Sequence, residues 1–220
     1  RRVLFRSGLP VLSTLNDLLH SGDKIEKIEA VLSGTLSYIF NSYDGSVPFS
    51  KVVKKAKTKG YTEPDPRDDL NGIDVARKLL ILARETGHML ELKDIDTENL
   101  VPEKARSSKS VEEFFTKLKK EDTYFDSIRD KAAKNNEKLC YIATLEKKKA
   151  YIRLDSIGQN HPFYSLSGSD NIVSFTTNRY KNTPLVIKGP GAGAEVTAAG
   201  VFADILRISN TSFDGKIAHR

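Results

Sequence analysis

The sequence predicts an α/β fold of the mixed α+β kind, with helices packed on a mixed β-sheet. Two observations predict it: apolar residues recur at helical spacing through most of the first half, and four segments of the second half are rich in β-branched and aromatic residues. A glycine-rich turn followed by an alanine-rich segment then predicts a closing strand–turn–helix unit. With 220 residues, the chain can bury a sizeable core in one domain or two small ones.

The first half is expected to hold four helices and one strand. Apolar residues three and four apart predict helices over residues 10–20, 35–43, 49–59 and from about 69 to 86. Residues 24–32 alternate and predict a strand. Three of these helices are expected to end at Gly22, Gly60 and Gly87. Gly60 stands at a position that favours a left-handed cap. Asp68 or Asp69 is expected to cap the fourth helix.

The second half is expected to be richer in strands. Two Lys- and Glu-rich helices, residues 111–119 and 123–134, come first. The expected strands are residues 139–145, 151–157, 172–177 and 185–188, and an Ala-rich helix over residues 195–208 follows. Strands from both halves could join one sheet.

The ends and the composition limit the function classes. Residues 1–7, RRVLFRS, resemble the translation of a sequencing-adapter tail and are interpreted as an artefact, so that the natural chain is expected to be cut just before Gly8. Removing their three arginines lowers the formal charge from +6 to +3, which is ordinary. The lone Cys140 excludes an internal disulfide, and no apolar run is long enough to span a bilayer. The sequence predicts neither a membrane nor a nucleic acid as partner.

An acid-dense loop, residues 60–69, precedes a helix that carries Asp74 and Lys78. These two residues are four apart and project from one helix face; the simplest interpretation is a surface ion pair worth a few tenths of a kcal/mol. Five apolar residues argue for a largely buried helix instead, and a buried charge needs a partner and a reason. They are Ile73, Val75, Leu79, Leu80 and Leu82. Glu63 and Asp69 could lie at the same end, where an acidic cluster suits an ammonium group or a metal ion.

Two further segments favour ligand contact without requiring it. In KGPGAGAEVTAAG, residues 188–200, glycines between a strand and a helix let the backbone approach an anion, although a tight packing turn explains them as well. The segment is not the dinucleotide fingerprint, because Val196 stands where its last glycine is required. In LSGTLSYIFN, residues 32–41, Gly34 and Thr35 begin a helix whose free amides could hold a carboxylate, or they form an ordinary helix start.

The block of residues 56–78, AKTKGYTEPDPRDDLNGIDVARK, resembles the diagnostic motif of homoserine dehydrogenases, with every fixed position in register. Five other segments resemble the same family: GLPVLSTLNDLL, SGTLSYIFN, KLLILARETG, HPFYSLSGSDNIVSFTTNRY and KGPGAGAEVTAAGVFADILRI. The resemblance covers nearly all of residues 8–208 and is strongest to the dehydrogenase half of bifunctional aspartokinase–homoserine dehydrogenases.

The resemblance implies reversible hydride transfer between NAD(P)H and aspartate 4-semialdehyde, which gives L-homoserine for threonine and methionine synthesis. It also implies a role for each candidate residue: Lys78 and Asp74 in catalysis; Glu63, Asp69, Tyr61, Gly34 and Thr35 in substrate binding; Gly193 in cofactor binding; and the Leu9 carbonyl oxygen in a site for a monovalent cation, sodium or potassium. The family also implies a homodimer and, in the full-length protein, an aspartate kinase fused to it. Plastid and cytoplasm both stay open, as does the choice between NAD and NADP.

The chemistry agrees with these roles. Hydride addition to an aldehyde puts negative charge on its oxygen, which a lysine ammonium within hydrogen-bond reach stabilises and protonates. Asp74, one helical turn back, would favour the protonated form of Lys78. The acids of the loop would grip the ammonium group of a zwitterionic amino acid.

The resemblance divides the chain into a catalytic and dimerisation domain, residues 8–183, a remnant of a Rossmann-type nucleotide-binding domain, residues 184–208, and a tail, residues 209–220. The opening strand and glycine turn of that nucleotide-binding domain do not occur upstream of Gly8. We therefore expect the chain alone to bind NAD(P) poorly, to be inactive, and to expose apolar residues of its last helix. These are Val201, Phe202, Ile205 and Leu206.

Two other function classes are weighed against the dehydrogenase. A divalent-metal hydrolase would use Glu63, Asp65, Asp68 and Asp69 as oxygen ligands, although no histidine lies near them in the sequence. A basic nucleic-acid-binding module would use the lysines among residues 117–120 and 147–149, but these runs lack interleaved aromatic residues.

Overall fold

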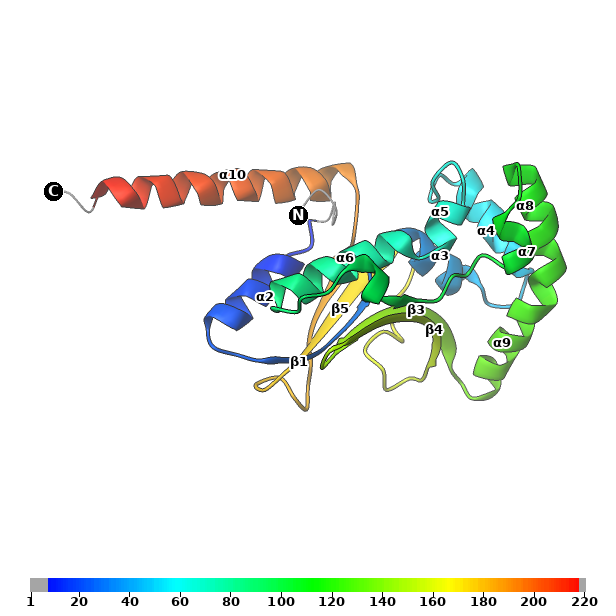
Figure 1. The fold of residues 1–220 in the computed structure, drawn as a ribbon, viewed down its shortest axis with the longest axis horizontal. Coiled ribbons are helices and arrows are strands. Elements are labelled where there is room, and N and C mark those ends of the chain that lie inside the picture. Colours follow the sequence, from blue (N-terminus) through cyan, green and yellow to red (C-terminus); the bar gives the residue numbers. More distant parts are fainter. Residues whose placement is uncertain (1–7, 218–220) are drawn as a thin grey trace.

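The computed structural model describes the backbone of residues 8–217 and the side chains of residues 8–209. Residues 1–7, interpreted as an artefact, lie outside the described residues, as do residues 218–220 at the end of the predicted tail. Figure 1 shows helices packed against a mixed six-stranded sheet, which confirms the predicted fold class. None of the helices within residues 8–217 has both the length and the apolar character needed to cross a bilayer.

The sheet joins strands from both halves of the chain, as the sequence predicts. Its order is β2-β4-β3-β1-β5-β6, and all neighbours are antiparallel except the parallel pair β2–β4. The strands are β1 Ile25–Val31, β2 Asp96–Thr97, β3 Lys138–Glu146, β4 Lys149–Ile157, β5 Asp170–Thr177 and β6 Leu185–Pro190. Strand β2 was missed because two residues are too few to show a period.

Most helices lie where the apolar spacing predicts them. The helices are α2 Val11–His20, α3 Gly34–Ser42, α4 Phe49–Thr58, α5 Arg67–Leu70, α6 Ile73–Glu85, α7 Glu103–Arg106, α8 Val111–Leu118, α9 Asp122–Lys134 and α10 Ala194–Ile217, with 3₁₀ turns η1 Leu92–Asp94 and η2 Lys119–Glu121. Gly60 has a φ of +75°, so its prediction as a left-handed cap is confirmed.

The fourth predicted helix is two helices, so its prediction as one helix was wrong. Neither Asp68 nor Asp69 caps α6; both lie inside the short helix α5. The break is Gly72, whose φ of +75° interrupts the helical path. A Cβ there would lie 2.2 Å from Tyr141 Oη and 2.9 Å from Thr97 Cγ2, so this position requires glycine.

The core lies on both faces of the sheet. On the helical face, buried side chains from α2, α3, α4, α6, α8, α9 and the strands form one cluster, which includes Leu15, Ile39 and Phe49. On the other face, Phe163 and Leu166 from the loop after β4 cover a smaller cluster. Burial there raises the pKa of the Cys140 thiol to about 12, so that this cysteine stays protonated and unreactive.

The C-terminal segment combines an edge strand with a protruding helix. Strand β6 pairs with β5, and α10 then extends away from the body of the molecule to Ile217, beyond the predicted end at residue 208 (Figure 1). The apolar residues predicted to be exposed are exposed, with fractions from 47% at Leu206 to 61% at Phe202. The boundary between residues 183 and 184 stays a prediction.

Candidate active site

Lys78 is held in a sheltered position by two oxygen partners. Its Nζ lies 2.8 Å from Asp74 Oδ2 and donates a second hydrogen bond of 2.8 Å to the Leu32 carbonyl. The Lys78 side chain is only 15% exposed, whereas that of Asp74 is 53% exposed. An ammonium group has three N–H donors, so two described contacts leave one for a bound molecule.

The surroundings of α6 explain this half-sheltered position. Val75, Leu79 and Leu82 are buried, but Ile73 is 42% exposed and Leu80 is partly buried. The expectation that apolar residues bury most of this helix was therefore wrong for Ile73. The helix has an open side, and the Asp74–Lys78 pair lies at its edge.

The Leu32 carbonyl brings Lys78 to the start of α3. Leu32 follows β1 directly, and Ser33 then caps α3 by accepting a hydrogen bond from the Leu36 N–H at 3.2 Å. Gly34 begins the helix against the chain before β5, because a Cβ at Gly34 would lie 3.1 Å from the Ser169 carbonyl oxygen. Lys78 and the α3 N-terminus are thus joined through a single short segment.

The acid-dense loop is fastened to the same helix start. The Thr35 hydroxyl donates to the Tyr61 carbonyl at 2.5 Å, and the Glu63 N–H donates to Asp69 Oδ2 at 2.8 Å. The Tyr61 ring, 41% exposed, stacks on Tyr38 with 4.3 Å between centroids. Together with Gly34, all five predicted substrate-binding residues therefore lie around one end of α3.

Asp69 lies near the negative charges of Glu63 and Asp68. Burial is the main cause that raises its pKa, and the charges of Glu63 and Asp68 raise it further, whereas the hydrogen bond from the Glu63 N–H and the nearby Thr35 hydroxyl lower it. In the part of the chain whose side chains are described, none of these three acids forms an ion pair with a basic residue. The cluster is therefore suited to binding a cationic group from outside.

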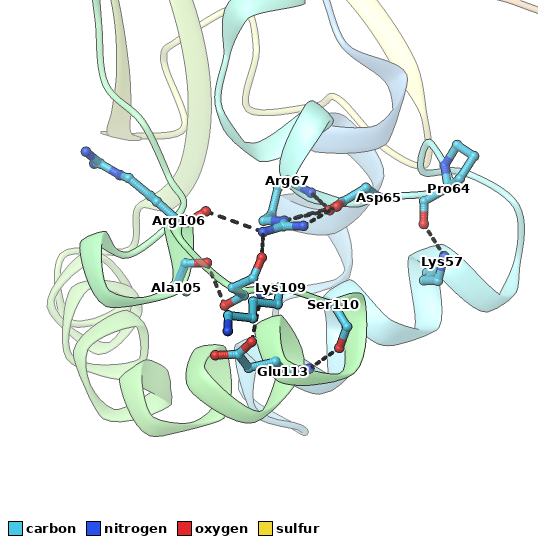
Figure 2. A network of polar contacts seen from close by, with 10 residues as sticks. Lys57, Pro64, Asp65, Arg67, Ala105, Arg106, Lys109, Ser110 and Glu113 are labelled. Carbon is cyan, nitrogen blue, oxygen red and sulfur yellow. Dashed lines mark hydrogen bonds and ion pairs between the residues drawn. The ribbon is translucent and has the colours of Figure 1, made fainter.

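Asp65 has a different and structural role. Its carboxylate forms an ion pair with Arg67 at 2.5 Å, and Arg67 Nη1 donates to the Ser108 carbonyl at 2.6 Å and to the Arg106 carbonyl at 3.3 Å. Figure 2 shows Arg67 between Asp65 and the segment that joins α7 to α8. This network holds the acid-dense loop against a distant part of the chain.

The Arg67 network argues against the metal-hydrolase alternative, because it occupies one of that alternative's four proposed ligands. Within the described side chains, no group of three or more His, Cys, Asp or Glu residues is arranged to hold a metal ion.

The lysines of residues 147–149, used by the nucleic-acid alternative, lie exposed at the turn from β3 to β4.

Replacing Arg67 with glutamine is expected to lower the free energy of unfolding by about 1–3 kcal/mol at pH 7, because the Ser108 carbonyl and the Asp65 carboxylate lose a charged donor. Arg67 lowers the pKa of Asp65, so this stabilisation is present above the unfolded pKa near 3.8 and is lost as the pH falls through the lower folded value. Urea unfolding at pH 7 and at pH 3 measures both effects. Arg77→Gln, at an exposed position, is the control; equal losses in the two variants would contradict the role of the network.

The glycine-rich turn lies beside the start of the described chain. Gly193, with a φ of +140°, leads into α10, and Leu9 packs on β6, where a Cβ at Gly189 would lie 3.1 Å from Leu9 Cδ2. The Leu9 carbonyl already accepts a hydrogen bond of 2.8 Å from the Val11 N–H. Roles for Leu9 in a cation site and for Gly193 at the cofactor stay predictions.

Sequence reasoning assigned no role to Asn171, which connects these segments. Its side chain faces the helical side of β5, and the residue is 9% exposed. Its Oδ1 is buried without a hydrogen-bond partner and lies 3.9 Å from the Cβ position of Gly34, while the carboxamide lies against Gly191. A signal was available in the sequence, because Asn171 is polar at an inward position of a strand that continues with Val173 and Phe175.

Comparison with known proteins identifies relatives of this chain. The family model described as homoserine dehydrogenase matches residues 10–206. Bifunctional aspartokinase/homoserine dehydrogenase 1, chloroplastic, of Zea mays is 54% identical over 206 residues, which are 93% of this chain and 22% of the maize protein. Homoserine dehydrogenase of Schizosaccharomyces pombe is 47% identical over 210 residues, covering 92% of this chain and 56% of the yeast protein.

Solved structures share the fold. A Candida auris protein described as of unknown function has a TM-score of 0.88 at 46% identity, over 93% of this chain and 59% of that one. A hyperthermophilic archaeal homoserine dehydrogenase in complex with NADPH has a TM-score of 0.67 at 24% identity, over 94% of this chain and 54% of that one, and shows the fold alone. The chain thus spans about a fifth of the plant bifunctional relatives and just over half of the yeast one.

Proposed function

The chain belongs to the homoserine dehydrogenase family, and we propose that the full-length protein interconverts L-homoserine and L-aspartate 4-semialdehyde with a nicotinamide cofactor, in threonine and methionine synthesis. The observation that carries the proposal is the sheltered Lys78 ammonium beside the start of α3, which the acid-dense loop also contacts. Because the chain spans only 22% of the maize relative, this activity is proposed for the full-length protein.

The acidic cluster and the helix start suit the two charged groups of the substrate. Glu63 and Asp69 would hold the ammonium group, since they lack a basic partner among the described side chains. The amides of Gly34 and Thr35, at the positive end of α3, would hold the carboxylate. Tyr61, whose carbonyl is fixed by Thr35, would form one wall of the pocket.

Lys78 would act at the reacting oxygen. When bound, a nicotinamide cofactor would supply the hydride that reduces the aldehyde carbon. The Nζ of Lys78 donates a proton to the developing alkoxide, the hydroxyl of L-homoserine forms, and the neutral amine regains a proton from solvent. In oxidation the neutral amine accepts the hydroxyl proton. Asp74, at 2.8 Å, orients Nζ and stabilises its positive charge.

The glycine-rich turn fits a cofactor group. Gly191 leaves room that a side chain would fill, since a Cβ there would lie 2.4 Å from the Asn171 carboxamide, and Gly193 adopts a backbone conformation that favours glycine. Backbone that approaches this closely is what a planar ring or a phosphate needs at a turn before a helix. The archaeal homoserine dehydrogenase that shares this fold was solved with NADPH, and a nicotinamide cofactor is the group we propose for this turn.

The proposal is tested by assaying the purified full-length protein for oxidation of NADPH that depends on aspartate 4-semialdehyde. Turnover that vanishes when the aldehyde is omitted is expected. Absence of turnover with both NADPH and NADH, in a protein that gives a cooperative thermal transition, would contradict the proposed function.

Replacing Asp69 with asparagine is expected to raise the KM for L-homoserine at least about 10-fold, because a charged acceptor for the ammonium is lost. The same change is expected to raise the Tm without substrate. The folded state raises the pKa of Asp69 above its unfolded value near 3.8, so the ionised carboxylate destabilises the fold at pH 7, and this destabilisation disappears as the pH falls below about 3.8. Steady-state kinetics and thermal unfolding measure the two effects. Asp17→Asn, at an exposed position of α2, is the control, and an unchanged KM in Asp69→Asn would remove this residue from the binding site.

The remaining expectations are part of the same proposal. The kinase domains of the maize and Buchnera relatives support fusion to an aspartate kinase. The chloroplastic plant relatives support a location in the plastid. The fungal relatives leave a cytoplasmic location open. The homodimer and the monovalent-cation site at Leu9 rest on the family alone. Inactivity of the 220-residue chain by itself is supported by the exposed apolar face of α10, which includes Val201 and Phe202.

A further inference from the structure

Asn171 is a buried polar residue that none of the interactions within the described chain explains. Its Oδ1 is inaccessible to solvent and has no hydrogen-bond donor, although buried carbonyl-type oxygens are nearly always paired. The residue is 9% exposed, and its side chain lies on the helical face of β5, where Val173 and Phe175 are fully buried. An unpaired acceptor in such a position costs stability, so a bound molecule that supplies a donor would recover it.

The position of Asn171 indicates which molecule that is. A Cβ at Gly191 would come within 2.4 Å of Asn171 Nδ2 and 2.7 Å of its Oδ1, so the plane of the carboxamide lies against the bare backbone of the glycine-rich turn. Its Oδ1 lies 3.9 Å from the Cβ position of Gly34, at the start of α3. Lys78 Nζ binds the Leu32 carbonyl two residues before Gly34. Asn171 therefore lies where the proposed substrate pocket meets the proposed cofactor turn.

The chemistry of the Asn171 carboxamide indicates which group of a bound molecule it would contact. The unpaired atom is an acceptor and needs a donor, while the same side chain offers two N–H donors. An aldehyde or a carboxylate offers no donor, the substrate ammonium is expected at Glu63 and Asp69, and the L-homoserine hydroxyl is expected at Lys78. The carboxamide of a nicotinamide ring has an N–H₂ and a C=O side by side, which is the complement of an asparagine side chain.

We propose that Asn171 binds the carboxamide of the nicotinamide ring, through the juxtaposition of its unpaired Oδ1 with the Gly191 turn and the Gly34 helix start. This inference rests on the proposed function and adds to it a residue that sets the position of the ring relative to Lys78. Gly191 contributes by leaving the space in which the Asn171 carboxamide lies. The pair would orient the reactive face of the ring towards the substrate pocket.

The test compares two cofactors in the full-length protein by equilibrium binding, which does not require turnover. NADPH and its 3-acetylpyridine analogue, which lacks the amide N–H₂, are titrated against wild type and Asn171→Leu, with the quenching of protein fluorescence or the cofactor emission as readout. Asn171→Leu is expected to raise the Kd of NADPH about 10-fold and that of the analogue by a clearly smaller factor, because the analogue keeps the carbonyl oxygen but lacks the N–H₂ that Oδ1 would accept from. Asn178→Leu, an exposed asparagine just beyond the other end of β5, is the control and is expected to change neither.

Stability separates binding from a structural role. Because Oδ1 is unpaired in the described structure, Asn171→Leu is expected to keep or raise the Tm of the protein without cofactor. Asn171→Asp, which keeps the acceptor but loses both donors, is expected to bind NADPH with an intermediate Kd. Gly191→Ala is expected to weaken NADPH binding as Asn171→Leu does, because its methyl group displaces the carboxamide.

The outcomes distinguish the two proposals. If wild type binds neither NADPH nor NADH, the proposed function fails; if it binds NADH alone, the same comparison is made with NADH and its 3-acetylpyridine analogue. If wild type binds NADPH but Asn171→Leu loses affinity equally for both cofactors, or for neither, the assignment of Asn171 is wrong and the proposed function stands. A fall in Tm of the cofactor-free Asn171→Leu variant, together with equal losses for both cofactors, would show that Asn171 serves the fold alone.

Discussion

Replacing Lys78 with alanine in the full-length protein is expected to lower kcat by at least about 100-fold, the usual contribution of a positioned general acid. The structure gives the reason: Lys78 Nζ is fixed by Asp74 and the Leu32 carbonyl, and its side chain is only 15% exposed. Water that enters the space left by the side chain would be a weaker acid and would lack a fixed position. The KM for L-homoserine is expected to change much less, because Glu63 and Asp69 hold the ammonium group elsewhere.

Steady-state kinetics in both directions measure this effect, with a folded state verified by thermal unfolding. Arg77→Ala is the matched control, because it removes a positive charge from the exposed side of the same helix and is expected to keep kcat within about two-fold of wild type. A Lys78→Ala variant with near-normal turnover would remove Lys78 from the chemistry. A rise in KM at constant kcat would assign it to substrate binding instead.

Replacing Gly72 with alanine is expected to lower the free energy of unfolding by about 2–5 kcal/mol. The left-handed backbone at φ +75° costs an L-residue about 1–2 kcal/mol. The new Cβ would also lie 2.2 Å from Tyr141 Oη and 2.9 Å from Thr97 Cγ2, and such overpacking costs about 1–3 kcal/mol more. Gly72 joins α5, which carries Asp69, to α6, which carries Lys78, so the same strain would separate the acidic cluster from the lysine.

Gly60→Ala is the matched control for this prediction. Gly60 has the same φ of +75°, but a Cβ there would meet nothing within 4 Å, so only the backbone cost applies, about 1–2 kcal/mol. Urea unfolding of both variants separates the two contributions. Equal losses in Gly72→Ala and Gly60→Ala would show that the contact with Tyr141 carries no energy.

Local patterns predicted most of the fold because they depend on neighbours in the chain. The period of the apolar residues gave α2, α4, α8 and α9 within about two residues, and the alternation in residues 24–32 gave β1. The division of residues 67–85 into α5 and α6 was not predictable, because the reason for Gly72 is the hydroxyl of Tyr141, far along the chain. Asp68 and Asp69 looked like helix caps only because this partner was unknown.

In the candidate site, too, contacts between neighbours in the chain were predictable, whereas contacts between distant segments were not. The spacing of Asp74 and Lys78 predicts their contact, and the structure contains it at 2.8 Å. The pairing of Asp65 with Arg67 could have been suspected from their separation of two residues, but the Ser108 carbonyl that completes the network is 41 residues away from Arg67. The role of Asn171 was even harder to predict from the sequence. It depends on contacts with Gly34 and Gly191, which are distant in the chain and lie next to Asn171 only in the folded structure.

The most direct measurement is a crystal structure of the full-length protein with L-homoserine and the oxidised cofactor. Lys78 Nζ is expected within about 2.6–3.2 Å of the substrate hydroxyl oxygen, while it keeps its contacts with Asp74 and the Leu32 carbonyl, and the substrate ammonium is expected between Glu63 and Asp69. A substrate whose hydroxyl faces away from Lys78, or whose ammonium lies apart from both acids, would contradict the mechanism.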